Sequence, residues 1–352
     1  MSASVFDHPW LSALLGDEEL ARHFSAEAEL RAMLEFEVAL AMAEAELGII
    51  PMEAAQAIAA TALTFQPDRA ALAAGTARDG MVVPDWVSQL RRAVGTPHGE
   101  HVHFGSTSQD VLDTSLILRL KPVLGILAAR LTAFDSRLAA LAADHGSRST
   151  MGRTRMQRAL PITWKDRIAT WRDPLTRHQK RLQELTGRLL VVQCGGPVGT
   201  LDKLGDKGPS VAAALASRLD LAVPAISWHS ARDTLAEFAG WLSMLTGALG
   251  KIGQDIALLA QNEIAEVTVT GAGQSSAMHH KQNPVLAEIL VTLARFNATQ
   301  ISAMHHALVH EQERSGAAWT LEWMVLPQMT VAAGASLARG LTLLDALRIN
   351  AK

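Results

Sequence analysis

The hydrophobic positions of this chain recur every three to four residues over long stretches, which is the period of an α-helix. Residues 232–264 show this most clearly, because their apolar residues follow alternating steps of three and four through several heptads. This heptad seam consists of Leu235, Phe238, Leu242, Leu245, Leu249, Ile252, Ile256 and Leu259. Trp241, Met244 and Ala248 widen the apolar surface, so we expect the helix to be buried between several others.

The same periodicity predicts helices before and after this one. They are expected at residues 25–47, 51–63, 84–94, 108–144, 161–190 and 284–310, with two more inside 319–347. Ser25 is a suitable N-cap and Gly48 a suitable stop for the first helix, and Pro122 is expected to kink the fourth. Since no long stretch alternates polar and apolar residues as a half-buried strand does, the predicted fold class is all-α.

Glycine and histidine interrupt the helical pattern at residues 95–105, and irregular structure is also expected at 145–151 and 193–208. We therefore expect an N-terminal helical domain at 1–104, a central long-helix bundle at 105–347 and a short tail at 348–352. The apolar seams of long, nearly parallel helices are longer than one chain can easily cover, which predicts an oligomer.

Composition favours a helical fold and argues against some classes of binding partner. The chain has 352 residues, of which 49% are hydrophobic and none is tyrosine, a composition that favours helices over sheets. Its formal net charge of −3 argues against nucleic acid or an anionic membrane held by bulk electrostatics. Neither a signal peptide nor a membrane span is expected, and the single cysteine, Cys194, is compatible with a reducing cytoplasm, where we place the protein.

A polar island, GAGQSSAMHHKQNP at 271–284, separates two of the predicted helices. Its glycines free the backbone to bring Ser275 and Ser276 close to a ligand. Lys281 offers a point charge to an anion, and Asn283 offers a paired donor and acceptor. The loop could be an ordinary connection between two helices, but such a connection needs none of these polar groups. A loop that binds an anion uses all of them.

Three smaller islands lie at other predicted helix ends. HVHFGSTSQD, at 101–110, places Thr107 and Ser108 where backbone N–H groups converge on an anion, although Ser106 or Ser108 there could also be a simple N-cap. Residues 152–163, GRTRMQRALPIT, are rich in arginine, which binds carboxylates through two hydrogen bonds. Arg314 precedes the last helical region, within HEQERSGAAWTLEW. Helix bundles build sites from facing helices, so these islands are candidates for one composite site.

The long island resembles the signature loop of the fumarase/aspartase superfamily, GSSxMPxKxNP. The matching residues are Gly273, Ser275, Ser276, Met278, Lys281, Asn283 and Pro284, whereas Gln274 and His279 depart from the pattern. Residues 105–110 resemble the first signature region of the superfamily. Arg153, Thr154 and Gln157 fit its second region, GRTHxQ, where Arg155 replaces the histidine.

Three further segments resemble the lactone-forming cycloisomerase branch of that superfamily: residues 34–51, 228–233 and 310–323. The resemblance implies a three-domain plan whose small C-terminal domain is missing or reduced here. It also implies a homotetramer with shared active sites and a small-molecule polycarboxylate substrate. A fumarate-releasing lyase similar to adenylosuccinate lyase and a non-catalytic member of the superfamily are the alternatives.

The resemblance also gives each residue an expected role. Ser275 would be the general acid, with Ser276 as the alternative donor, while Lys281 and Asn283 would bind the carboxylate that gains charge. The remaining substrate contacts would come from hydroxyl and amide groups, from arginines and from two histidines: Thr107, Ser108, Thr154, Gln157, Arg153, Arg155, Arg314, His103 and His229. No histidine spacing indicates a metal site, and no cofactor is implied.

Overall fold

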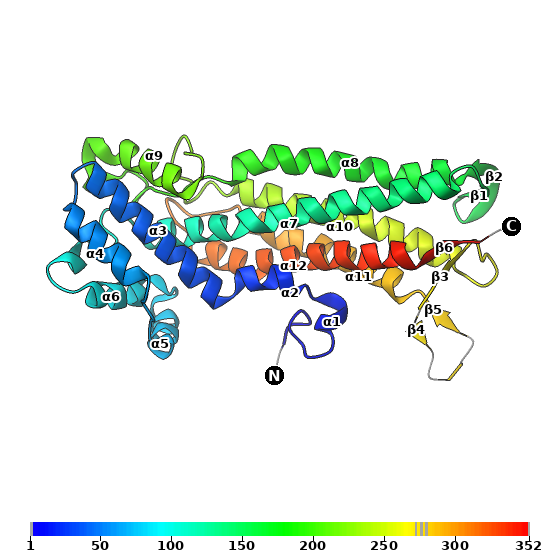
Figure 1. Ribbon diagram of the computed structural model, residues 1–352, viewed down its shortest axis with the longest axis horizontal. Coiled ribbons are helices and arrows are strands. Elements are labelled where there is room, and N and C mark those ends of the chain that lie inside the picture. The colour runs from blue at the N-terminus through cyan, green and yellow to red at the C-terminus, as the bar shows by residue number, and fades with distance from the viewer. Residues whose placement is uncertain (1–2, 272, 275–276, 279–280, 351–352) are drawn as a thin grey trace.

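The computed structural model describes residues 3–271, 273–274, 277–278 and 281–350. Helices dominate, in agreement with the all-α prediction, and short strand pairs gather at one end of an elongated molecule (Figure 1). The helices are α1 (Ser12–Leu15), α2 (Glu18–Ala21), α3 (Ala26–Glu46), α4 (Met52–Ala62), α5 (Arg69–Asp79), α6 (Val83–Val94), α7 (Ser108–His145), α8 (Trp164–Leu189), α9 (Gly208–Leu219), α10 (Asp233–Leu259), α11 (Val285–His306) and α12 (Gly316–Ala346).

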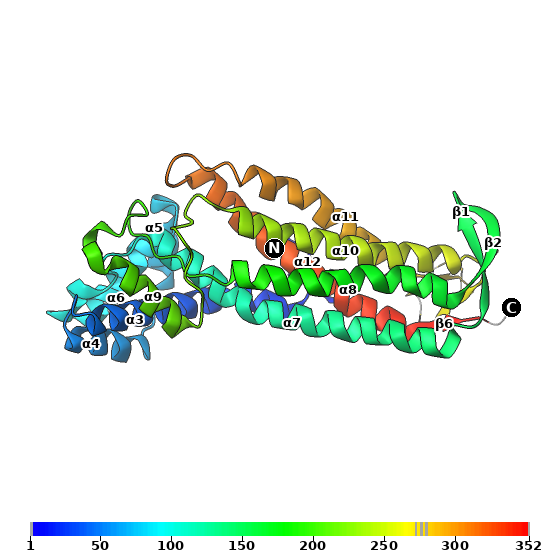
Figure 2. The same cartoon turned by 90° about the horizontal axis from the view of Figure 1, so that it is seen from above.

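Five long helices, α7, α8, α10, α11 and α12, run side by side and form the bundle (Figures 1 and 2). All eight residues of the heptad seam on α10 are buried in the main core, so the seam prediction is confirmed. The backbones of α10 and α11 pass close together, because a Cβ atom at Gly253 would lie 2.5 Å from the carbonyl oxygen of Ala287. Met244 is 50% exposed in the single chain, so α10 is not enclosed on that side.

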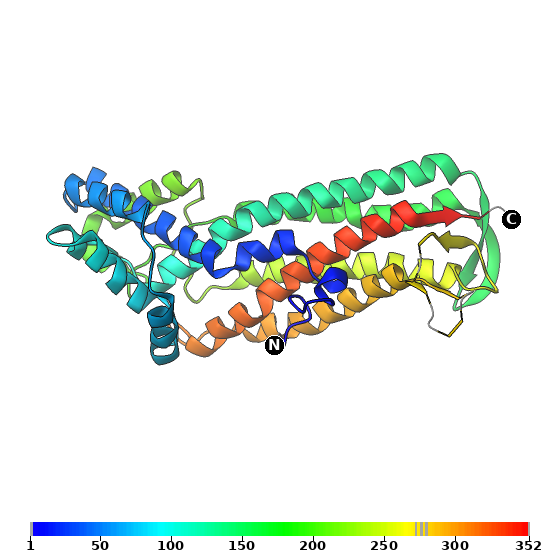
Figure 3. The ribbon, with the colours of Figure 1, turned by 60° about the horizontal axis from the view of Figure 1, so that its bottom comes forward.

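The shorter helices α3, α4, α5, α6 and α9 cluster around the start of α7 (Figure 3). They surround a second core that includes Trp86, Phe36 and Val211. Because α9 lies within the predicted central domain, the two parts of the chain share this core. The domain bounds 1–104, 105–347 and 348–352 stay predictions.

Several predicted boundaries are confirmed. Ser25 caps α3 by accepting a hydrogen bond from the N–H of Ala28, and Gly48 follows the helix with a φ of 64°. The α7 helix continues past Pro122 for its whole predicted length. The α10 helix ends at Leu259, five residues before the predicted end at residue 264.

Other predictions are wrong at identifiable places. The residues between α7 and α8 form an antiparallel hairpin of β1 (Ser149–Thr154) and β2 (Gln157–Thr163), and α8 begins after it, at Trp164. Thr163 sets that start because it caps the helix by accepting from the N–H of Asp166. The two helices expected inside 319–347 are one helix, α12, with Pro327 in its interior. The sequence pattern had not indicated α5 or α9.

Two further strand pairs lie near the hairpin. β3 (Val267–Val269) pairs with β6 (Leu347–Ile349), and β4 (Gly273–Gln274) pairs with β5 (Gln282–Asn283). The β4–β5 pair forms the base of the signature loop, and β6 holds the last described residues beside it (Figure 1). None of the helices that the structure describes is long and apolar enough to cross a membrane.

Candidate active site

The predicted site residues that the structure describes fall into two groups at opposite ends of the bundle (Figures 1 and 2). His103, Thr107, Ser108, His229 and Arg314 lie around the N-terminus of α7, a region called here the α7 start. Arg153, Thr154, Arg155, Gln157, Lys281 and Asn283 lie at the other end, on the β1–β2 hairpin and the signature loop, called here the hairpin end. The α7 helix has 38 residues, so about 57 Å separates its two ends.

Asp110 organises the α7 start, a role that the sequence pattern did not predict. Its fully buried carboxylate accepts hydrogen bonds from the N–H groups of Gly195 and Gly196, both at 2.9 Å, and of Thr107 at 3.1 Å. Thr107 is the N-cap residue and Ser108 begins the helix, so neither Ser106 nor Ser108 is the cap. The side chains of Thr107 and Ser108 remain partly exposed beside this anchor.

His229 lies on the buried side of Asp110 and not on its solvent side. Its side chain is 3% exposed, and its Nε2 is 2.8 Å from Oδ1 of Asp110. Its Nδ1 has no hydrogen-bond partner among the described residues. These contacts fit a residue that holds Asp110 in place better than one that touches a substrate.

Arg314 approaches the α7 start from the loop before α12. Its Nε donates to the Gln109 side-chain oxygen at 3.0 Å, and an Nη donates to the backbone oxygen of Pro197 at 3.0 Å. No ion pair links its guanidinium to a carboxylate within the described ranges. A positive charge without a carboxylate partner among the described residues therefore lies at Gln109, next in the chain to the partly exposed Thr107 and Ser108.

A buried ionic cluster holds three helices together beneath the α7 start. Arg232, at the start of α10, is paired with Asp113 of α7 and with Glu322 of α12 through four hydrogen bonds. The two carboxylates raise the pKa of the Arg232 guanidinium despite its burial. The indole of Trp319 donates to Asp113 at 3.1 Å. The charges of Arg232, Asp113 and Glu322 are paired with one another and buried. The cluster therefore supports the site and is not itself a binding surface.

The hairpin end has an unusual turn. Thr154 pairs with Gln157, and the two residues between them, Arg155 and Met156, have φ values of 49° and 66°. Both residues are exposed, and neither is a glycine or asparagine, which such a turn normally requires. The hairpin therefore projects Arg155 from the molecule with its backbone in the left-handed region.

Arg153 differs from Arg155, because its charge is already paired. One Nη lies 2.7 Å from the buried carboxylate of Glu266, which also accepts from the hydroxyl of Thr150. Arg153 therefore fastens the hairpin to the segment that precedes β3. The adjoining cavity of about 950 Å³ is lined by residues of the hairpin, α8 and α10, including Arg155 and Lys251.

The signature loop is only partly described. Ser275, Ser276 and His279 lie outside the described residues. Asn283 belongs to β5 and pairs with Gly273, while the N–H of Lys281 donates to the carbonyl of Met278 at 3.0 Å. The Lys281 side chain is exposed at the hairpin end.

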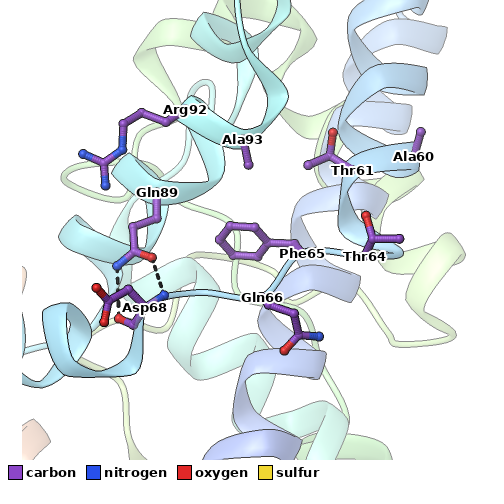
Figure 4. A pocket seen from close by; sticks show the side chains of 9 residues that line it. All are labelled: Ala60, Thr61, Thr64, Phe65, Gln66, Asp68, Gln89, Arg92 and Ala93. Atoms are coloured by element: carbon purple, nitrogen blue, oxygen red, sulfur yellow. Dashed lines mark hydrogen bonds between the residues drawn. The ribbon is translucent and has the colours of Figure 1, made fainter.

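A separate cavity of about 760 Å³ lies between α4 and α6, beside the segment that joins α4 to α5, and contains no predicted site residue (Figure 4). The amide of Gln89 accepts from the N–H of Asp68 at 2.8 Å and donates to its carbonyl oxygen at 3.3 Å. Both polar atoms of the Gln89 side-chain amide therefore have hydrogen-bond partners within the protein. Across the described ranges, no three His, Cys, Asp or Glu side chains are placed to hold a metal ion.

A profile of the lyase family matches residues 17–299. This chain belongs to the lyase family. The prediction of the fumarase/aspartase superfamily is confirmed by this match and by the relatives below. The 3-carboxy-cis,cis-muconate cycloisomerase of Pseudomonas aeruginosa is 40% identical to this lyase over 94% of the chain and 73% of its own length.

Two other comparisons bear on the reaction of this lyase. The crystal structure of the 3-carboxy-cis,cis-muconate lactonizing enzyme from Pseudomonas putida matches 97% of the chain and 78% of its own chain, with 37% identity and a TM-score of 0.91. The N-acetyl-S-(2-succino)cysteine lyase of Enterococcus italicus is 35% identical over 99% of the chain and 77% of its own length.

The sequence reasoning missed the supporting carboxylates of this lyase site. Besides Asp110, it missed Glu266, which pairs with Arg153, and Glu37, which bonds to His103. Glu37 was detectable in principle, because it is a charged residue on the apolar face of a predicted helix. Glu266 gave no such signal, since it lies in an irregular stretch after α10.

Proposed function

We propose that this lyase is a 3-carboxy-cis,cis-muconate cycloisomerase. The observation that carries the proposal is its 40% identity, over nearly the whole chain, to an enzyme of that name. The substrate and pathway implied by that name, protocatechuate degradation, belong to the same proposal.

The reaction is an intramolecular addition. One carboxylate oxygen of the substrate forms a C–O bond to a carbon conjugated with a second carboxylate, and negative charge builds up on that second group. A proton delivered to carbon then completes the lactone, and two carboxylates remain. The site must therefore bind several anionic groups, stabilise the one that gains charge, and supply one proton.

In this proposal the active site is built from more than one chain. Arg314, Thr107 and Ser108 lie at one end of α7, and Arg155 and Lys281 lie at the other, and the helix between them is about 57 Å long. Packing of copies that brings the α7 start of one chain to the hairpin end of another would complete the set. The exposed Met244 on α10 supports such packing, and we propose a homotetramer.

The residues then take distinct roles. Ser275 delivers the proton, and Lys281 and Asn283 bind the carboxylate that gains charge. Arg155 and Arg314 supply positive charge for the other carboxylates. Arg153 and His229 support the site from behind, because each already has a carboxylate partner.

A second candidate function is cleavage of a succinyl thioether with release of fumarate. The specific observation that favours it is the similarity to N-acetyl-S-(2-succino)cysteine lyase over 99% of the chain. The chemistry is related, because elimination is the reverse of addition to a conjugated carboxylate.

The proposed function is tested by adding 3-carboxy-cis,cis-muconate and following the loss of its diene absorbance. We expect the absorbance to fall rapidly with the wild type. The Ser275→Ala variant should react at least about 100-fold more slowly, and the neighbouring control Ser276→Ala should slow the reaction less. An inactive wild type contradicts the proposal, and fumarate release from a succinyl thioether in a parallel assay would establish the second candidate.

A further inference from the structure

Two carboxyl side chains lie inside the apolar face of α3, where they pack toward the α7 start. Glu37 is 1% exposed and Glu44 is fully buried, and the two are seven residues apart, or two turns along one face of the helix. Burying a carboxyl group is costly unless it is hydrogen-bonded or paired, and Glu37 has such partners whereas Glu44 has none among the described residues.

Glu37 bonds twice to one residue, His103. One carboxylate oxygen accepts from the backbone N–H of His103 at 3.0 Å, and the other lies 2.6 Å from its Nδ1. The backbone of His103 has a φ of 61°, in the left-handed region that few residues other than glycine and asparagine adopt. The pair of bonds therefore fixes both the strained backbone and the imidazole ring of His103.

The tautomer of His103 follows from its hydrogen bonds. One carboxylate oxygen of Glu37 accepts from the backbone N–H of His103, and the other lies 2.6 Å from Nδ1. A carboxylate oxygen accepts, so Nδ1 of His103 carries the proton and Nε2 is the nitrogen left for a ligand. Burial and the neighbouring Glu37 raise the pKa of Glu44 to about 9, so Glu44 is neutral at pH 7.

His103 lies in the loop that leads into α7, four residues before Thr107. Its side chain keeps 12% of its surface exposed, and no interaction of Nε2 is found among the described residues. Resting on the proposed function, we propose that Glu37 is a positioning residue that orients His103 so that its Nε2 binds a substrate carboxylate beside Thr107 and Ser108. His103 would make this contact equally with the bound substrate and with the transition state. It therefore lowers KM more than it raises kcat.

The chain offers a matched pair of variants. Glu37→Gln replaces the charged acceptor, and Glu44→Gln makes the same change two turns away at an acid that is already neutral. We expect Glu37→Gln to raise KM about tenfold with little change in kcat, and Glu44→Gln to leave both unchanged. In a His103→Gln background, Glu37→Gln should raise KM no further, because the two residues act through one contact.

A second measurement needs no substrate. In full-length protein labelled with ¹⁵N-histidine, the His103 signals should show protonated Nδ1 in the wild type and in Glu44→Gln, and a mixture of tautomers in Glu37→Gln. The Glu37→Asp variant, which keeps the charge, should restore the wild-type pattern at least in part.

The proposal is overturned by a folded Glu37→Gln variant with wild-type KM, or by an unchanged His103 spectrum in that variant. It is also overturned if Glu37→Gln raises KM equally with and without His103. Should Glu37→Gln fail to fold, the wild-type spectrum still decides, since protonation of His103 at Nε2 contradicts the assignment. Failure of the proposed function would look different, because the wild type would leave the muconate unchanged while the spectra behaved as expected.

Discussion

Replacing Glu44 by glutamine should stabilise the fold by an amount that grows with pH. Glu44 is fully buried, and neither of its carboxyl oxygens has a hydrogen-bond partner among the described residues. Its pKa rises from 4.5 to about 9 because burial, and then the charge of Glu37, disfavour the ionised form. The folded chain therefore keeps a proton that the unfolded chain releases above pH 4.5, so the stability contributed by this group falls as pH rises from 4.5 to about 9.

The size of the effect follows from the interval between these values. At about 1.4 kcal/mol for each pH unit, the cost of keeping the proton is below about 1 kcal/mol at pH 5, about 3 kcal/mol at pH 7 and about 5 kcal/mol at pH 8. Glutamine has no proton to hold, so it removes this cost. Its unpaired amide brings a penalty of its own, but that penalty does not change with pH.

The assay is urea unfolding of wild type and Glu44→Gln at several pH values and one fixed protein concentration, so that the two proteins are compared at the same concentration of subunits. The control is Glu35→Gln, an exposed glutamate on the same helix, which should show no difference that depends on pH. A stability difference between wild type and Glu44→Gln that is the same at pH 5 and pH 8 would show that Glu44 does not hold a proton in the folded chain.

Three further predictions concern the bundle. Arg232→Met should cost about 3–5 kcal/mol in urea unfolding because it leaves two buried carboxylates unpaired, and a loss below 1 kcal/mol would contradict that description of the cluster. Gly253→Ala should lower Tm because its Cβ would meet the backbone of α11, whereas Gly247→Ala, with open space around it on the same helix, should be neutral or stabilising. Burial and nearby arginines lower the pKa of His178 from 6.5 to about 4, so stability should fall by about 3 kcal/mol as pH drops between these values. His178→Phe should abolish that acid sensitivity, and an unchanged pH dependence in this variant would disprove the assignment.

The sequence predicted the long helices well because their signal is local and repeated. The seam on α10 repeats a simple pattern over many turns. Ser25 marks a helix start through its side-chain hydroxyl, and Gly48 marks the end through its positive φ. The hairpin after α7 was missed because its turn is Arg155–Met156 rather than the usual asparagine and glycine. The two helices predicted inside 319–347 are one helix, which accommodates Pro327 in its interior.

The contacts of the candidate site were harder to predict from the sequence, because they join segments that are far apart in the chain. Asp110 bonds to residues 85 and 119 positions away in the chain, and Glu37 bonds to a residue 66 positions away. No local pattern encodes such pairs. The placement of the candidate residues at two ends of the molecule follows from the unbroken length of α7, which the structure shows.

We propose that the active site combines the α7 start of one chain with the hairpin end of another. Two inactive variants test this directly, one changed at Arg314 and one at Arg155, which are dissociated and then allowed to reassemble together. We expect the mixture to regain cycloisomerase activity, because some sites then receive both intact ends. Mixtures that stay as inactive as their separate components, despite proven subunit exchange, would contradict it.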